Sequence, residues 1–154
     1  MIKKFIIYII ISFFLYSCGF QPIYINKNKS DLKIEKINFS GDRLINNYLK
    51  LYFKRYTNNE SDKILIIDVK SKYDKKTLSK DKTGNVVDYE LVIKADFNIT
   101  LNGKFIKTIS LSDKFIMQKN LDKYEEQNYD NSIKQNFANS LYEKVIIQLT
   151  GLQK

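Results

Sequence analysis

The sequence predicts an α+β domain in which a sheet of about four strands carries two amphipathic helices on one face. Residues 87–101 alternate between apolar and polar side chains, which is typical of a strand with one wet face. Segments 44–56 and 133–149 repeat apolar residues every three or four positions, as amphipathic helices do. The expected order is strand, helix, three strands, helix. Two amphipathic helices beside a half-apolar sheet make a two-layer sandwich.

The first strand and the first helix are expected between residues 31 and 56. The apolar positions of DLKIEKINF (31–39) change parity after Ile34, which indicates a strand with a β-bulge. Residues 40–42, Ser-Gly-Asp, supply a turn and an N-cap. The helix that follows carries an apolar stripe made of Leu44, Ile45, Tyr48, Leu49, Tyr52 and Tyr56. We interpret this stripe as core rather than as a ligand platform.

Three strands follow a break at residues 57–59. Residues 64–73 are first continuously apolar and then alternate, which predicts a strand, and residues 80–85 predict a turn. The long strand after the turn has an apolar face made of Val87, Tyr89, Leu91, Ile93, Ala95, Phe97, Ile99 and Leu101. Its polar face carries Asp88, Glu90, Lys94, Asp96, Asn98 and Thr100. The last strand has Phe105, Ile109, Leu111 and Phe115 on one parity.

The loop before the last strand decides which of its faces meets the core. A two-residue Asn102-Gly103 loop would pair Leu101 with Lys104 and place the apolar sets of the two strands on opposite faces. We therefore expect a three-residue loop, residues 101–103, with Gly103 as a left-handed bulge residue. The expected pairs are Ile99 with Phe105 and Ile93 with Leu111.

The C-terminal helix is expected to begin at Asn128 or Asp130, because either residue can act as an N-cap. Gly151 is expected to end it. At 1.5 Å per residue it would be roughly 30 Å long, enough to cross a four-stranded sheet. Its apolar stripe consists of Ile133, Phe137, Leu141, Val145 and Leu149. The carboxylates that precede it, Asp122, Glu125 and Glu126, are expected in a solvated polar loop beside Lys119 and Lys123.

The composition argues against several kinds of function. The chain of 154 residues has no His and one Cys, which removes His-based catalysis and most zinc sites. We find no Gly-rich phosphate loop and no metal-ligand spacing, so we expect no catalytic residues and no metal. The net charge of +9 favours a polyanionic partner. Nucleic acid is not expected, because all but two of the 26 basic residues are dispersed Lys rather than Arg.

The N-terminus has the organisation of an export signal. Two Lys precede the uncharged run FIIYIIISFFL (5–15), which is shorter than the about 20 residues that span a bilayer. Leu15, Ser17 and Cys18 then occupy positions −3, −1 and +1 in a pattern that resembles the lipobox of bacterial lipoproteins. The resemblance implies cleavage between Ser17 and Cys18, diacylglycerol on the Cys18 sulfur and acylation of the new amino terminus. Beyond this covalent lipid, no cofactor is expected.

The residues around Cys18 bear on processing and location. Tyr16 stands where lipoboxes usually have a small residue, so an uncleaved membrane anchor with an incidental Cys is the alternative. Gly19 is not the Asp that commonly retains lipoproteins in the inner membrane, which favours the outer membrane. We predict a cleaved signal peptide over residues 1–17, the lipidated Cys and a tether over 18–30, and a single α/β lipoprotein domain over 31–154. Two or three acyl chains would anchor it stably.

Three segments resemble the lipopolysaccharide-assembly lipoprotein family of Gram-negative bacteria. They are CGFQPIY (18–24), Tyr89-Glu90-Leu91 at the start of the long strand, and NSIKQNFANSLYEKVIIQL (131–149). The resemblance implies a two-layer α/β plug without catalytic residues, lodged in the lumen of a large outer-membrane β-barrel. Plug and barrel together would deliver lipopolysaccharide to the outer leaflet, and the plug itself would bind lipopolysaccharide. The alternative is an accessory lipoprotein that binds another envelope component or ligand on the periplasmic side, without a barrel.

Four Lys are the candidates for contact with the barrel or with lipopolysaccharide: Lys75, Lys76, Lys80 and Lys82. They are expected around one hairpin end, where they would meet acidic residues of the lumen or the phosphates of lipopolysaccharide. The alternative for each of them is an ordinary solvated hairpin tip. The scarcity of Arg and the abundance of Lys depart from the family, so the resemblance itself assigns no contact residue.

Replacing Cys18 with Ala tests the lipid anchor. The chain has no other Cys, so C18A should abolish labelling by a radioactive fatty acid and leave an uncleaved precursor. Labelling and electrophoretic mobility in growing cells measure both effects. Unchanged labelling of C18A would contradict acylation at this residue.

Overall fold

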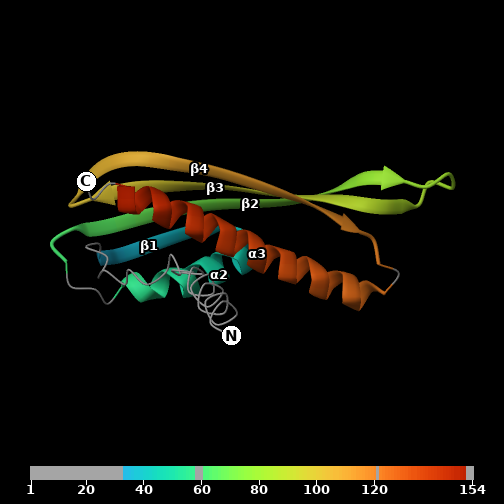
Figure 1. The fold of residues 1–154 in the computed structure, drawn as a ribbon, viewed down its shortest axis with the longest axis horizontal. Coiled ribbons are helices and arrows are strands. Elements are labelled where there is room, and N and C mark those ends of the chain that lie inside the picture. Colours follow the sequence, from blue (N-terminus) through green and yellow to red (C-terminus); the bar gives the residue numbers. More distant parts are fainter. Residues whose placement is uncertain (1–32, 58–60, 121, 152–154) are drawn as a thin grey trace, which may run out of the picture.

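The computed structural model describes residues 33–57, 61–120 and 122–151 (Figure 1). The predicted signal peptide, Ser17, Cys18 and the tether lie outside the described residues. In the described part, no helix is both long and apolar enough to cross a membrane.

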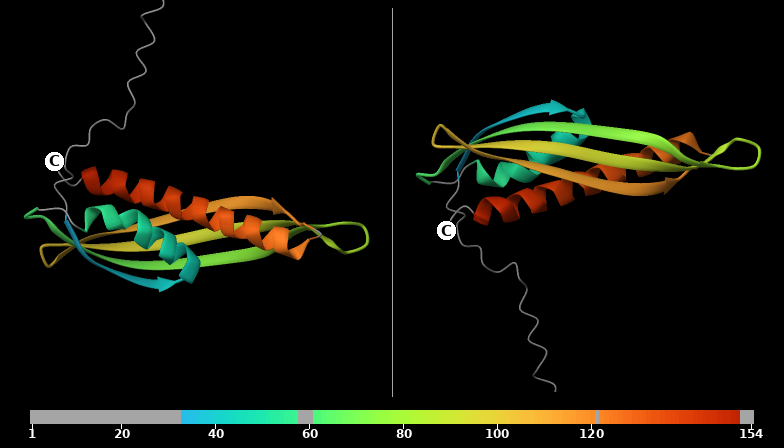
Figure 2. Two further views of the ribbon diagram at one scale, coloured as in Figure 1. Left: turned by 90° about the horizontal axis from the view of Figure 1, so that it is seen from below. Right: turned by 90° about the horizontal axis from the view of Figure 1, so that it is seen from above.

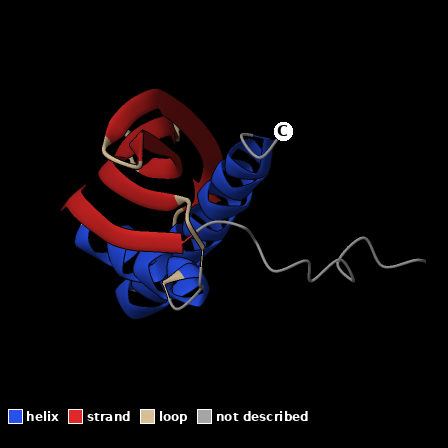
Figure 3. Ribbon diagram, turned by 90° about the vertical axis from the view of Figure 1, so that its left-hand side faces the viewer, coloured by secondary structure: helices blue, strands red, loops and turns tan. Residues whose placement is uncertain are grey.

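The predicted order of elements and the two-layer fold are confirmed. The elements are β1 (Lys33–Gly41), α2 (Arg43–Phe53), the 3-10 turn η2 (Lys54–Tyr56), β2 (Ile64–Lys80), β3 (Val86–Leu101), β4 (Lys104–Gln118) and α3 (Lys123–Thr150). Figure 2 shows both helices in front of the sheet in one view and behind it in the other, and Figure 3 shows the two layers from one end. The helices therefore cover one face of the sheet and leave the opposite face open.

The sheet is mixed, with the strand order β1-β2-β3-β4. β1 runs parallel to β2, with α2 as the crossover between them, and the other neighbours are antiparallel. The predicted bulge in the first strand is confirmed, because the β1–β2 register shifts between Ile34 and Lys36. The bulge lets both apolar sets of β1 face the helices, as Ile34 pairs with Leu65 and Ile37 with Ile67.

A tight junction links β1 to α2. Gly41 has φ +100°, and a Cβ on it would lie 1.7 Å from the Ser71 carbonyl oxygen, so only glycine fits here. The Ser71 hydroxyl accepts a hydrogen bond from the Asp42 amide (3.0 Å) and donates one to Asn46 Oδ1 (2.8 Å). Asn46 Nδ2 donates to the Ser40 carbonyl (3.1 Å). These bonds satisfy two polar side chains, Asn46 and Ser71, that the crossover buries.

The first helix begins where the sequence predicts. The Asp42 carboxylate accepts hydrogen bonds from the amides of Leu44 and Ile45, each 3.0 Å long, which is N-cap geometry. The stripe on this helix is core, as predicted: Ile45 and Leu49 are fully buried and its tyrosines are partly buried against the core.

One apolar core fills the space between the sheet and the helices. β3 supplies its centre, and all five residues of the predicted α3 stripe are buried in it. The largest fully buried side chains are Phe53, Phe97, Ile34, Ile45, Leu49, Leu65, Ile67, Leu91, Ile93, Ile99, Met117 and Leu141.

The predicted loop between β3 and β4 is wrong. Leu101 pairs with Lys104, so the loop is the two-residue Asn102-Gly103 turn that we rejected. Both turn residues have positive φ, 48° and 80°, as a hairpin turn that matches the sheet twist requires. A bulge at Ile106 restores the parity instead, because the register shifts between Thr100 and Ile99. The observed pairs are Thr100 with Phe105, Ile99 with Lys107, Ala95 with Leu111 and Ile93 with Asp113.

The predicted start of the C-terminal helix is also wrong. α3 begins two turns earlier, with Asp122 as its N-cap, and spans 28 residues, or about 42 Å. The Asp122 carboxylate accepts hydrogen bonds from the amides of Tyr124 (2.7 Å) and Glu125 (3.2 Å). Glu125 and Glu126 therefore lie in the first helical turn rather than in a loop, where the helix dipole favours negative charge. The predicted end at Gly151 is confirmed.

Truncating one core residue of β3 tests which face is buried. Ile93 is 0% exposed, so I93A should lower the free energy of unfolding by about 2–5 kcal/mol through a core cavity. Its neighbour Lys94 is exposed on the other face, so K94A should change it little. Urea denaturation of both variants makes the comparison. Equal losses would show that β3 is buried on both faces.

Candidate partner-binding surface

The open face of the sheet is the largest surface that the helices leave uncovered (Figure 2). On β3 it carries the polar set that the sequence predicts, and β2 and β4 add polar side chains beside it. The added residues are Asp68, Lys70, Lys72, Asp74 and Lys76 from β2, and Thr108, Ser110, Ser112 and Lys114 from β4. Opposite charges meet at two cross-strand pairs of this face, where Lys70 lies opposite Asp96 and Lys76 opposite Glu90, whereas Lys72 lies opposite Lys94.

Hydrogen bonds between strands hold three pairs of polar side chains on the open face in place. Ser110 Oγ donates to Asp96 Oδ1 (2.6 Å), and Thr108 Oγ1 donates to Asn98 Oδ1 (2.7 Å). Across the β1–β2 pair, a similar bond runs from Asn38 to Asp68 (2.6 Å). These bonds fix the rotamers of six polar side chains before any partner arrives, so this part of the face loses little side-chain entropy on binding. The same face also carries Ile116, which is 60% exposed.

The β2–β3 hairpin extends beyond the start of α3 (Figure 1) and ends in a structured turn. Asp81 Oδ1 accepts hydrogen bonds from the amides of Thr83 (2.8 Å) and Asn85 (2.9 Å) and from the Thr83 hydroxyl (2.7 Å). Hydrogen bonds from these two residues lower the pKa of the Asp81 carboxyl from 3.8 to about 2. The turn thus presents the exposed side chains of Lys80 and Lys82 from a fixed backbone.

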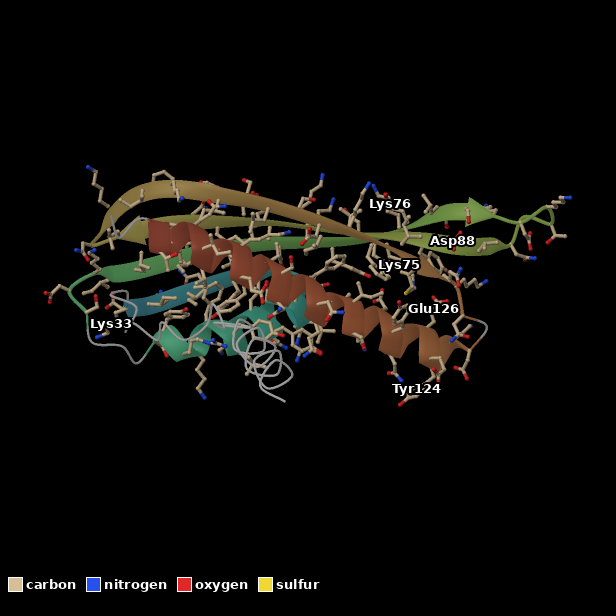
Figure 4. The ribbon with its side chains drawn as sticks, in the orientation of Figure 1. Lys33, Lys75, Lys76, Asp88, Tyr124 and Glu126 are labelled. Carbon is tan, nitrogen blue, oxygen red and sulfur yellow. The ribbon has the colours of Figure 1, made fainter. Side chains whose placement is uncertain are left out.

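The four candidate Lys lie toward this hairpin end but on different faces, and Figure 4 labels Lys75 and Lys76. Lys76 is on the open face, and Lys80 and Lys82 flank the turn. Lys75 is on the helix side, where its Nζ lies 2.8 Å from Glu126 Oε1 and 4.2 Å from the centre of the Tyr89 ring. Lys75 is two residues after Tyr73 in the same strand, so strand alternation could have indicated that both side chains lie on the helix side. The Glu126 contact was missed because we placed Glu126 in a loop.

A hollow of about 560 Å³ lies between the hairpin and the start of α3. It is lined by Lys75, Tyr89, Lys119, Asn120, Lys123, Glu126, Gln127 and Asp130. Three of the lining side chains are Lys and two are acidic, so the hollow has a small excess of positive charge. It depends on the early start of α3, which the sequence reasoning missed although Asp122 and Glu125 have the spacing of a helix-capping pair.

A polar cluster behind this hollow ties α3 to the sheet and to α2. The Tyr73 hydroxyl donates a hydrogen bond to Asp130, and burial together with this bond raises the Tyr73 pKa. Lys134 Nζ lies 3.8 Å from Asp130 and 3.4 Å from Asp42, and 4.2 Å above the Tyr73 ring. The protonated Tyr73 phenol acts as the donor, and the cluster holds α3 against the sheet and the start of α2.

The described residues contain no group of three or more His, Cys, Asp or Glu that could hold a metal ion. The carboxylates singled out from the sequence are used locally: Asp122 caps α3 and Glu126 pairs with Lys75.

Comparisons with known proteins find likeness in structure but not in sequence. No protein-family model matches the chain, and no curated protein matches it. Rare lipoprotein B from Shewanella oneidensis is 14% identical, with 77% of this chain and 99% of that chain covered and a TM-score of 0.57. The minor lipoprotein from Acinetobacter baumannii is 14% identical, with coverages of 77% and 92% and a TM-score of 0.53. An uncharacterized lipoprotein B from Nitrosomonas europaea is 13% identical, with coverages of 82% and 90% and a TM-score of 0.54. At these identities, what the chains share is the fold.

Charge reversal at two adjacent Lys tests the placement of the hairpin side chains. K75E would place a carboxylate beside Glu126, whose side chain is only 17% exposed, and should cost about 1 kcal/mol of stability. K76E lies on the exposed open face and should cost less. Thermal denaturation at low salt compares the two variants, and a larger loss for K76E would contradict the placement.

Proposed function

We propose that this protein is an outer-membrane lipoprotein, anchored by lipid on Cys18, that plugs and helps assemble the lipopolysaccharide-translocating β-barrel. In this proposal residues 1–17 are removed as a signal peptide, residues 18–30 form the lipidated tether, and residues 31–154 form the plug domain on the periplasmic side or in the barrel lumen. The plug acts by binding, without catalytic residues, metal or cofactor. Together with the barrel it delivers lipopolysaccharide to the outer leaflet.

The observation that carries the proposal is the ordered polar face of the sheet. The lumen of an outer-membrane barrel is polar and wet, so a protein lodged in it should present a hydrogen-bonding surface rather than an apolar one. The open face meets this requirement with charged side chains of both signs and cross-strand hydrogen bonds. The fold shared with solved bacterial lipoproteins supports the same proposal.

The hairpin tip is the part we assign to contact with the barrel or with lipopolysaccharide. Lys76, Lys80 and Lys82 are exposed, and the Asp81 turn holds two of them on a fixed backbone. Lys side chains bind phosphate as point charges, and the phosphates of lipopolysaccharide and acidic lumen residues both offer such partners. Lys75 contributes less to this contact, because its side chain is 29% exposed and paired with Glu126.

Reversing the three exposed Lys tests this assignment. K76E/K80E/K82E should leave folding and acylation intact but weaken co-purification with the barrel and binding to lipopolysaccharide. The weakening should be greatest at low salt, where charge attraction is least screened. Affinity purification from detergent-solubilised outer membranes, followed by mass spectrometry, identifies the barrel and measures its recovery.

The matched control makes three reversals elsewhere. R43E/K50E/K54E changes the same net charge at exposed positions of α2 and η2. If both triple variants recover barrel and lipopolysaccharide at wild-type levels, the hairpin tip is not the contact. If the control variant loses as much barrel and lipopolysaccharide as K76E/K80E/K82E does, the loss reflects net charge, and the hairpin tip is again not the contact.

A further inference from the structure

The residues that join the domain to its N-terminal segment lie at the end of the sheet opposite the hairpin tip. Lys33 begins β1 and pairs with Ile64 at the start of β2, while Leu101 and Lys104 flank the β3–β4 turn at the same end. Figure 4 shows Lys33 at one end of the molecule and Lys76 toward the other. We call the former the anchor end, made of residues 33–36, 61–66, 99–107 and 146–151.

The anchor end exposes apolar side chains close to a tight turn. Phe105 is 59% exposed and Ile106 is 38% exposed. The bulge is the reason: Phe105 pairs with Thr100 and so faces the open side of the sheet, and Ile106 is the bulged residue. Ile147, on the last turns of α3, is 70% exposed. Two adjacent exposed apolar side chains such as Phe105 and Ile106 favour an apolar or interfacial partner.

Basic side chains accompany these apolar residues. The anchor end contains five Lys and two acidic residues, Glu35 and Asp62. Lys104 comes directly before Phe105, and Lys107 directly after Ile106. Long Lys side chains beside apolar groups can keep their ammonium groups at the lipid phosphates while the apolar groups enter the interface. Lys107 also donates to Gln148 Oε1 at 3.4 Å, which links the β3–β4 turn to α3.

We propose that the anchor end rests on an anionic phospholipid surface, with Phe105 and Ile106 inserted at the headgroup level. This inference rests on the proposed function, because acylated Cys18 is what would hold the protein at the membrane. Cys18 is fifteen positions before Lys33, a stretch that can reach at most about 50 Å. The tether therefore permits several orientations, of which this one places Phe105, Ile106 and the flanking Lys on the lipid. The hairpin tip then points away from the lipid.

Depth-dependent quenching tests this orientation. The mature lipoprotein is reconstituted in vesicles of phosphatidylethanolamine and phosphatidylglycerol that contain spin-labelled lipid. A fluorophore is attached to K104C, which keeps Phe105 and Ile106, or to the control K82C at the hairpin tip. We expect severalfold stronger quenching at position 104 than at position 82. Adding F105S and I106S to K104C should reduce it severalfold.

The outcomes decide between orientations. Weak quenching at position 104 would overturn the inference, because an anchor end covered by protein would give that result. Equal quenching at positions 104 and 82 would overturn it as well. Q148C on α3 gives the same test if K104C does not fold. Mass spectrometry of the labelled protein reports separately on Cys18: a second fluorophore means that its thiol is free and that the proposed anchoring fails, whatever the quenching pattern.

Discussion

The structure depends on one constraint, which is that the apolar side chains of all four strands must face the two helices. β3 sets the constraint, because its alternation leaves one face apolar and the other polar. The bulges in β1 and β4 satisfy this constraint. The β1 bulge turns Ile34 and Ile37 to the same side, and the bulge at Ile106 returns Ile109 to the core after a turn that would otherwise place it outside. A shift of one residue in any strand would expose its whole apolar set.

The same constraint produces the surfaces available for binding. One face of the sheet is buried in the core. The opposite face can therefore carry charged, hydroxyl and amide side chains that hydrogen-bond to one another across the strands. The bulge that rescues β4 also leaves Phe105 exposed beside the turn. The polar face, the basic hairpin tip and the apolar anchor end are thus consequences of a single packing solution, and they divide the molecule between a partner side and a lipid side in our proposal.

Sequence reasoning recovered what local periodicity encodes. It predicted the element order, the Asp42 cap, the β1 bulge, the α3 stripe and the buried residues of β3 from Leu91 to Ile99, although Val87 on the same predicted face is exposed. It failed where two local solutions give the same pattern: a longer loop and a short turn followed by a bulge both restore the parity of β4. It also shortened α3, since the first turns of that helix carry few apolar residues, and shortened β2, whose end past Tyr73 is polar. It left open the parallel pairing of β1 and the Lys75–Glu126 contact, which depend on tertiary packing.

The central claim is that the polar face of the sheet lies against a partner in the cell. Carbodiimide labelling of its carboxylates, read by mass spectrometry, tests this most directly. Asp96 and Glu90 on β3 should react readily in the purified protein and become protected when the protein is labelled in intact outer membranes. Equal reactivity of these two residues in both preparations would contradict the account.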